Sequence, residues 1–219
     1  AERNVRGADR FHGDDGPLRV SDQKWPHPGS LAFVEAGASL QLPRNDDFNG
    51  AQFEGAGSYD STIRDGQRWS AARAYLTDEA RRRPNLTIIT GALAERVEFE
   101  GKRAVGVRYS GGQLVKGRRV ILSGGAINSP QLLMLSGVGP GAQLKKLGLP
   151  VVADRAQVGQ NLQDHLDVLV QWNCNQPITL NSNTNPLVKI WTGLNWMLRK
   201  QGAASYMPTA AGAFVSTRP

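Results

Sequence analysis

A glycine pair followed by a serine-proline pair is the local pattern in this sequence best suited to chemistry. Gly124-Gly125 ends the apolar run Val120–Leu122, and Ser129-Pro130 follows four residues later. Glycines leave the backbone open to close approach, and a helix start presents unpaired N–H groups. The pattern indicates a place for a phosphate or the polar edge of a cofactor. The alternative, which the local pattern alone favours, is that the glycines only let a strand pack tightly on its own helix.

Other constellations that could carry out catalysis are missing from the sequence. The three histidines, His12, His27 and His165, lie far apart, and none has a second ligand at metal spacing. Asp164 directly precedes His165, but a serine-hydrolase triad is not expected because no G-x-S-x-G turn occurs. The G-x-G-x-x-G fingerprint of a dinucleotide-binding loop is also absent. We therefore predict no metal site, and we name no catalytic residue.

The composition resembles that of an ordinary soluble protein. Of the 219 residues, 40% are hydrophobic and 21% are charged, and the net charge is +7. The basic residues are scattered without interleaved aromatic residues, so we expect no nucleic-acid partner. No apolar run approaches the ~18 residues of a membrane span. Cys174 is the only cysteine, which excludes an internal disulfide and fits a cytoplasmic protein.

The two ends of the sequence suggest a piece of a longer chain. The first decade is charged and lacks an initiator methionine, and apolar residues run almost to the last position. We expect a fragment at both ends. In the complete protein, a membrane-peripheral or periplasmic location is then an alternative to the cytoplasm.

Apolar periodicity and capping residues predict five helices. Ser70 is expected to cap one of them and Pro84 to end it. Ser129 is a plausible N-cap with Pro130 at the first helical position, and Gly137 is placed for a left-handed C-cap. Residues 187–198 carry an apolar stripe that we interpret as core packing. The predicted helices lie in 28–42, 71–83, 130–135, 141–147 and 186–202.

Strand signals concentrate in the middle of the sequence. Alternating apolar residues and glycine turns predict an antiparallel meander over 96–100, 104–109 and 113–117. The short apolar run 120–122, which ends in glycine, is typical of a strand covered on both faces. Further strands are expected at 86–90, 151–152 and 166–172.

The stretch "GAINSPQLLMLSGVG" at 125–139 resembles the second signature of the glucose–methanol–choline (GMC) oxidoreductases at every defining position. "HGDDGPLRVSD" (12–22) and "VGQNLQDH" (158–165) resemble its flanking motifs. So do the "LPRNDDFNG…GQRWSAARAYL" stretch of 42–76 and the meander region of 83–109. The resemblance covers nearly the whole chain and is nearest to the choline- and alcohol-dehydrogenase-like branch.

This resemblance implies an FAD-dependent enzyme that oxidises the CH–OH group of a small-molecule alcohol by hydride transfer to flavin. The implied fold class is mixed α/β (α+β). It combines part of a Rossmann-like FAD domain, with its β-meander, and part of an antiparallel-sheet substrate domain. The FAD domain would take 81–163, and the substrate domain would take 1–80 and 164–219. The resemblance leaves the oligomeric state open, and a catalytically inert domain with a binding role remains the alternative.

Four residues carry over from the family as candidate FAD contacts: Ala94, Gly124, Gly125 and Ala126. Ala94 would approach the adenine through its backbone, and the three small residues would lie along the cofactor. The family's phosphate loop and catalytic histidine have no counterpart in these 219 residues, so the segment alone is expected to be inactive. Choline-type relatives often carry an acid where this chain has Ala210, and its absence favours a neutral alcohol. Aromatic side chains could still bind a cation.

Overall fold

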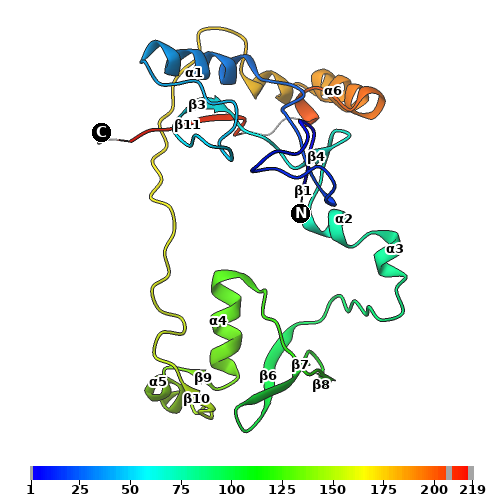
Figure 1. Cartoon of the computed structure of the whole chain (residues 1–219), viewed down its shortest axis with the longest axis vertical. Coiled ribbons are helices and arrows are strands. Elements are labelled where there is room, and N and C mark those ends of the chain that lie inside the picture. The colour runs from blue at the N-terminus through cyan, green and yellow to red at the C-terminus, as the bar shows by residue number, and fades with distance from the viewer. Residues whose placement is uncertain (1, 206–208, 217–219) are drawn as a thin grey trace. The chain divides into compact units, whose positions relative to one another are not determined.

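The computed structural model describes residues 2–205 and 209–216. The chain divides into two compact units: one joins 1–87 to 171–219, and the other is 88–170. Both contain helices and short strands, so the mixed α/β composition expected from the sequence is present (Figure 1). The assignment of 81–163 to an FAD domain and of the flanking segments to a substrate domain stays a prediction.

The described residues of the first unit form three small two-stranded sheets. In one, β1 (Glu2–Asn4) pairs in parallel with β2 (Leu18–Val20). In the second, β3 (Gly55–Ser58) pairs antiparallel with β11 (Ala211–Phe214), which joins the two distant parts of the chain. The third is the hairpin of β4 (Ile63–Arg64) and β5 (Gln67–Arg68). Its Asp-Gly turn has positive φ at both residues, as a two-residue hairpin requires.

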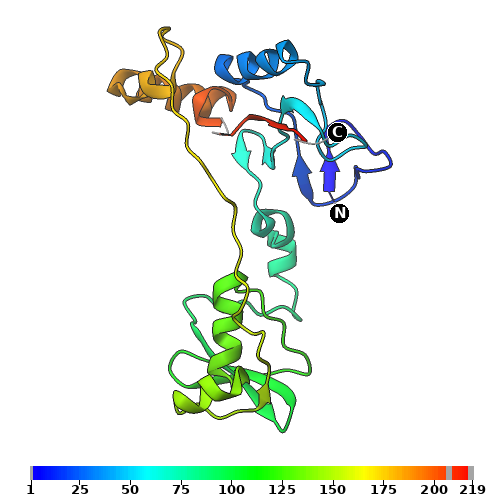
Figure 2. The same ribbon diagram turned by 90° about the vertical axis from the view of Figure 1, so that its left-hand side faces the viewer.

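Helix α1 (Pro28–Ser39) packs on the β3–β11 sheet in both views (Figures 1 and 2). The helix begins where expected because His27 Nδ1 accepts a hydrogen bond from the N–H of Gly29, and Pro28 takes the first position. A Cβ atom on Gly37 would lie 2.6 Å from that of Ala56, so only glycine permits this close contact. The small residues of the two elements thereby set the distance between helix and sheet.

Arg6 links three loops of the first unit through its guanidinium group. Its Nε donates to Asp22 Oδ1 at 2.8 Å, and Nη1 donates to the main-chain oxygen of Asp46 at 3.1 Å. Its Nη2 pairs with Asp60, whose side chain is only 10% exposed. Burial raises the pKa of Asp60 above its ordinary value, although the positive charge of Arg6 acts to lower it. This cluster fastens loops that are up to 54 residues apart in sequence.

Ser70 caps a helix as expected, but the helix is shorter than predicted. Its Oγ accepts from the N–H of Arg73, and α2 (Ala71–Tyr75) ends at Leu76. Thr77 then caps a separate short helix, α3 (Asp78–Arg81). The second capping residue explains why one predicted helix is two, because its hydroxyl satisfies the N–H groups of a new helix start.

The last long helix, α6 (Pro186–Arg199), confirms the predicted helix but not its predicted burial. The 3-10 helices η1 (Leu180–Thr184) and η2 (Ala203–Ser205) flank it. The expected core stripe is solvent-exposed, with Leu187, Trp191 and Leu198 exposed by 76%, 64% and 82%. No helix in the part of the chain that the structure describes is both long and apolar enough to cross a membrane.

The second unit is built on the predicted meander. Its strands are β6 (Ala94–Glu100), β7 (Arg103–Tyr109) and β8 (Gln113–Lys116), paired antiparallel in that order. Helix α4 (Gly125–Leu135) packs along β6. Two short strands, β9 (Val138–Gly139) and β10 (Ala153–Asp154), pair in parallel around α5 (Gly141–Lys146). The meander, α5 and the left-handed Gly137 with φ +86° are confirmed.

Three predicted strands are wrong, and a fourth is displaced. The runs 86–90, 120–122 and 166–172 are irregular, and the structure describes no segment paired with any of them. Ile121 is 77% exposed and Leu166 is 99% exposed. The strand expected at 151–152 begins two residues later, as β10. A strand needs a neighbour for its N–H and C=O groups, which an apolar run cannot supply by itself.

The start of α4 also differs from the prediction. The helix begins at Gly125, with Gly124 as its N-cap, so Pro130 lies inside it and not at its first position. Ser129 does not cap the helix but accepts a hydrogen bond from the N–H of Gly124 at 3.0 Å. Gly125 has φ +82°, a conformation that glycine adopts without strain.

Candidate functional site: a neutral cavity between a strand start and a helix start

The structure brings Ala94 and Gly124 to the wall of one cavity of about 400 Å³ in the second unit. Ala94 opens β6, and Gly124 precedes the first turn of α4. Leu93, Ile121 and Leu132 add apolar surface to the wall. Two of the four residues predicted from the sequence are therefore neighbours around one space, although 30 positions separate them in the chain.

A buried hydrogen bond holds the two walls together. Ser136, at the C-terminal end of α4, accepts a hydrogen bond from the N–H of Val97 in β6 at 2.7 Å. Its hydroxyl donates in turn to the main-chain oxygen of Leu132 at 2.5 Å. Ser136 and Val97 are only 6% and 4% exposed. This side chain links helix α4 to strand β6, the two elements that begin beside Gly124 and Ala94.

None of the described residues that line the cavity has an ionisable side chain. Its polar members are Ser123, Asn128, Ser129 and Gln131, and the remaining contacts are aliphatic or glycine. Amide and hydroxyl groups can orient a heterocycle or a sugar, and aliphatic groups pack against a flat ring. With no acid or base present, the cavity can bind a neutral group but cannot itself transfer a proton.

Gly125 and Ala126 do not line this cavity; both lie in the exposed first turn of α4, beside it. A Cβ atom on Gly125 would meet nothing within 4 Å, so its backbone conformation accounts for the glycine. At Gly124 a Cβ atom would lie 3.2 Å from Asn128 and 3.4 Å from Ser129. The crowding at Gly124 comes from its own helix, which supports the packing interpretation for that glycine beside its place in the cavity wall.

Sequence reasoning missed most of the wall, although a signal for it exists. Counting from Gly124 in helical steps of three or four residues gives Asn128, Gln131 or Leu132, and Leu135, all of which line the cavity. Leu93 precedes the predicted Ala94 directly. The wall could have been found by asking which face of the helix points back to the glycine.

The histidines do not gather at this or any other site. His12 lies in the first unit, with a side chain only 7% exposed, and it contacts Asp9 at 3.0 Å. His27 caps α1, and His165 is 99% exposed beside the equally exposed Asp164. Among the described residues, no three His, Cys, Asp or Glu side chains lie close enough together to hold a metal ion.

A comparison with models of known families shows which family this chain belongs to. The family model of GMC oxidoreductases matches residues 3–167, three-quarters of the chain. The chain belongs to the GMC oxidoreductase family. The match includes the meander, α4 and every candidate cofactor residue, so the resemblance seen in the signature stretch holds across the second unit.

Individual GMC relatives cover the whole chain but are much longer. This chain is 49% identical to a mitochondrial choline dehydrogenase of Homo sapiens, over 100% of its own length and 37% of the human protein. Among solved structures, an FAD-dependent oxidoreductase from Chaetomium thermophilum matches with a TM-score of 0.81 and 28% identity. That match covers 96% of this chain and 40% of the fungal one. The chain thus spans about two-fifths of the length of such relatives.

A further solved relative is a pyridoxine 4-oxidase from Mesorbium loti. It is 38% identical, with a TM-score of 0.66, over 70% of this chain and 31% of its own. GMC enzymes depend on FAD, and the cavity suits a part of that cofactor. Its neutral wall fits a heterocycle or a ribose and offers no positive charge to a diphosphate, and a space of about 400 Å³ is small for a whole dinucleotide.

Proposed function

We propose that the complete protein is an FAD-dependent oxidoreductase that oxidises an alcohol CH–OH group to a carbonyl. The observation that carries the proposal is the neutral cavity joining Ala94 to Gly124 inside a chain of the GMC family. Bound FAD would accept the hydride of the alcohol carbon. The role of these 219 residues would be to bind a ring or sugar of the cofactor, with Gly125 and Ala126 along its edge. The hydroxyl proton would pass to a base outside this segment.

We further propose a neutral alcohol as the substrate. Ala210 stands where choline-type relatives often have an acid; it is 2% exposed, and its main-chain oxygen accepts a hydrogen bond from Tyr59. An alanine offers no charge to a quaternary ammonium group. The alternative substrate is choline, as the name of the human relative suggests, with an aromatic side chain binding the cation. One of the similar solved structures is a pyridoxine 4-oxidase, whose name refers to a compound other than choline.

The test compares the complete protein with the 219-residue chain. We expect the complete protein to carry FAD and to reduce it with neutral alcohols faster than with choline. The 219-residue chain should retain little flavin and oxidise no alcohol. A complete protein that is folded but binds no flavin would contradict the proposal that it is a flavoenzyme. A 219-residue chain that holds flavin and oxidises alcohols would contradict the proposal that the catalytic base lies outside this segment.

Matched variants of the complete protein test the cavity itself. Ala94→Phe places an aromatic ring in the cavity wall and should lower flavin retention after gel filtration. The control is Ile127→Phe in helix α4, at a side chain that is 69% exposed and outside the cavity wall. Equal flavin content in the two variants would show that the cavity does not hold the cofactor.

A further inference from the structure

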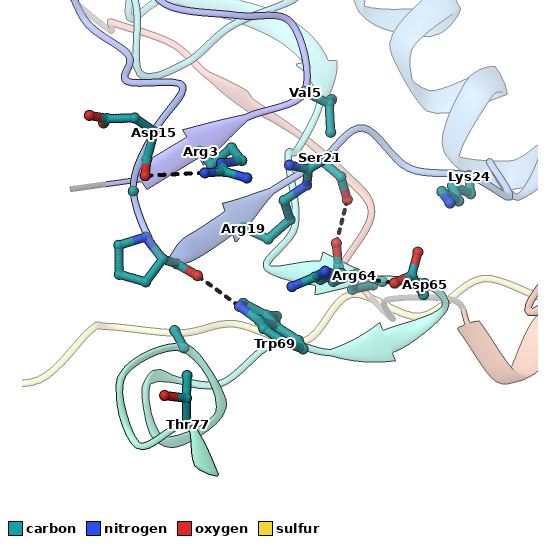
Figure 3. A pocket seen from close by; sticks show the side chains of 14 residues that line it. Arg3, Val5, Asp15, Arg19, Ser21, Lys24, Arg64, Asp65, Trp69 and Thr77 are labelled. Carbon is teal, nitrogen blue, oxygen red and sulfur yellow. Dashed lines mark hydrogen bonds and ion pairs between the residues drawn. The ribbon is translucent and has the colours of Figure 1, made fainter. Parts of the chain in front are cut away.

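A second cavity, of about 570 Å³, lies entirely in the first unit (Figure 3). Its wall comes from β1 and β2, from the β4–β5 hairpin and from the start of the α2–α3 region. Four cationic side chains and two acidic ones line it: Arg3, Arg19, Lys24 and Arg64 against Asp15 and Asp65. None of these residues belongs to the candidate cofactor site, and the excess of positive charge faces a concave space.

Most of this positive charge is uncompensated. Arg19 and Lys24 form no hydrogen bond or ion pair through their side chains with any residue that the structure describes. Arg3 donates only to the neutral main-chain oxygen of Asp15, at 3.3 Å. The Asp15 carboxylate points away from the Arg3 guanidinium in Figure 3. Cations with no carboxylate partner in a concave site raise the local concentration of anions.

Arg64 is held in place by the indole of Trp69. The guanidinium carbon lies 4.8 Å from the centre of the Trp69 ring, and Trp69 Nε1 donates to the main-chain oxygen of Pro17 at 2.9 Å. The partner of Arg64, Asp65, is 3.5 Å away with a 79% exposed side chain, which makes a weak pair. Stacking on an aromatic ring orients an arginine while its N–H groups stay available.

The backbone around these cations is cross-linked. Ser21 Oγ donates to the main-chain oxygen of Ile63 at 3.0 Å, and Ser21 and Ser61 exchange two backbone hydrogen bonds of 2.9 Å. Strand β2, which carries Arg19, is thus joined to the hairpin that carries Arg64. The cationic groups therefore stand on connected elements and do not have to be gathered when a ligand binds.

We propose that this cavity binds a small molecule through a phosphate group. Guanidinium groups match phosphate oxygens with two parallel hydrogen bonds, and several cations around one space favour a dianion over a monoanion. Two sources share this chemistry: a separate phosphorylated compound, and the diphosphate of a dinucleotide. The proposal does not depend on the alcohol oxidation proposed above, because no residue of the neutral cavity takes part.

The test is titration calorimetry of the 219-residue chain with inorganic phosphate and with pyrophosphate, at ionic strength fixed with chloride. We expect saturable binding at one site, tighter for pyrophosphate. Arg19→Gln and Lys24→Gln should each weaken it about tenfold, the effect of losing one charge-assisted hydrogen bond. The matched control is Arg44→Gln, a 73% exposed arginine outside the cavity, which should bind as wild type does.

Two further measurements sharpen the outcome. Trp69→Leu should weaken binding severalfold while Arg64 remains present, because the stack that orients its guanidinium is lost. Displacement of pyrophosphate by FAD would assign the site to a dinucleotide, and failure of FAD to displace it would assign the site to a separate phosphorylated compound. The absence of saturable heat in folded wild-type chain, or equal affinities for the Arg19, Lys24 and Arg44 variants, would overturn the proposal.

Discussion

Replacing Ser136 by alanine tests how the candidate cofactor site is held together. The Ser136 hydroxyl is the only side-chain partner that the structure describes for the Val97 N–H, and both residues are almost fully buried. Alanine removes the acceptor and leaves this N–H without a partner inside the unit. The hydrogen bond that the hydroxyl donates to Leu132 is lost as well.

The cost follows from burial. A buried donor left without a partner costs about 1–3 kcal/mol, so we expect Ser136→Ala to destabilise the second unit by about 2 kcal/mol. In a domain of roughly 60–100 residues, each kcal/mol lowers the melting temperature by about 4–8 °C. Because residues 88–170 form a unit of this size, the predicted drop is about 8–16 °C. Amide exchange of 94–100 should accelerate together with that of α4.

The matched control is Ser129→Ala on the same helix. The Ser129 hydroxyl also accepts a backbone hydrogen bond, but its donor, Gly124, is exposed and water can replace the hydroxyl. This variant should stay within about 0.5 kcal/mol of wild type, as surface substitutions usually do. Circular-dichroism melting and hydrogen-exchange mass spectrometry read both variants. If Ser136→Ala loses no more stability than Ser129→Ala, the buried bond does not hold the strand to the helix.

Variants at three further positions probe separate features. Burial lowers the pKa of His12, but its hydrogen bond to Asp9 and the charges of Asp47, Asp9 and Glu2 raise it above the ordinary value overall. Its contribution to stability is full below about pH 6.5 and is lost as the pH rises through the folded-state pKa. Urea midpoints should therefore fall as the pH rises above about 6.5 in wild type, and less so in His12→Gln. Gly137→Ala should cost about 2 kcal/mol or more in thermal unfolding, since φ is +86° and the new Cβ would lie 2.5 Å from the Pro150 oxygen. Asp154→Ala should cost about 1 kcal/mol, because Asp154 Oδ1 accepts from the Gly141 N–H at 2.9 Å; Asp154→Asn should recover most of it.

The helices of this chain could be predicted because their signals are local. A helix satisfies its backbone within one segment, so a capping residue and an apolar period are enough to place it. His27-Pro28 and Ser70 begin helices where expected, and Gly137 follows the end of α4. The meander was also predictable, since its glycine turns at 101 and 111–112 join strands that are neighbours in sequence.

The wrong strands share a different physical cause. An apolar run becomes a strand only when another segment accepts and donates its hydrogen bonds, and that partner can lie anywhere in the chain. The runs at 86–90, 120–122 and 166–172 have the composition of strands, but the structure describes no partner for them. The same reasoning covers α6: its stripe predicts a helix correctly, while its burial depends on a second surface that the stripe does not specify.

For the candidate site, the sequence could supply the residues but not their arrangement. The family resemblance pointed to Ala94 and Gly124, and the structure places both on one cavity. It also separates them from Gly125 and Ala126, a distinction that the signature does not make because all three small residues are adjacent in sequence. The hydrogen bond that links the helix to the strand, Val97 to Ser136, joins positions 39 residues apart and leaves no local pattern.

One wall of the cavity is supported differently from the others. Ile121 lines the candidate cofactor cavity, whereas Val120 lines a different, mostly apolar cavity of about 320 Å³ in the same unit. No described residue forms a backbone hydrogen bond with 118–123, the segment that lies between β8 and the Gly124 turn. The helix and strand walls are fixed by a buried hydrogen bond, but the Ile121 wall is not. The Ile121 wall is therefore the side of the cavity that no backbone hydrogen bond to a described residue supports.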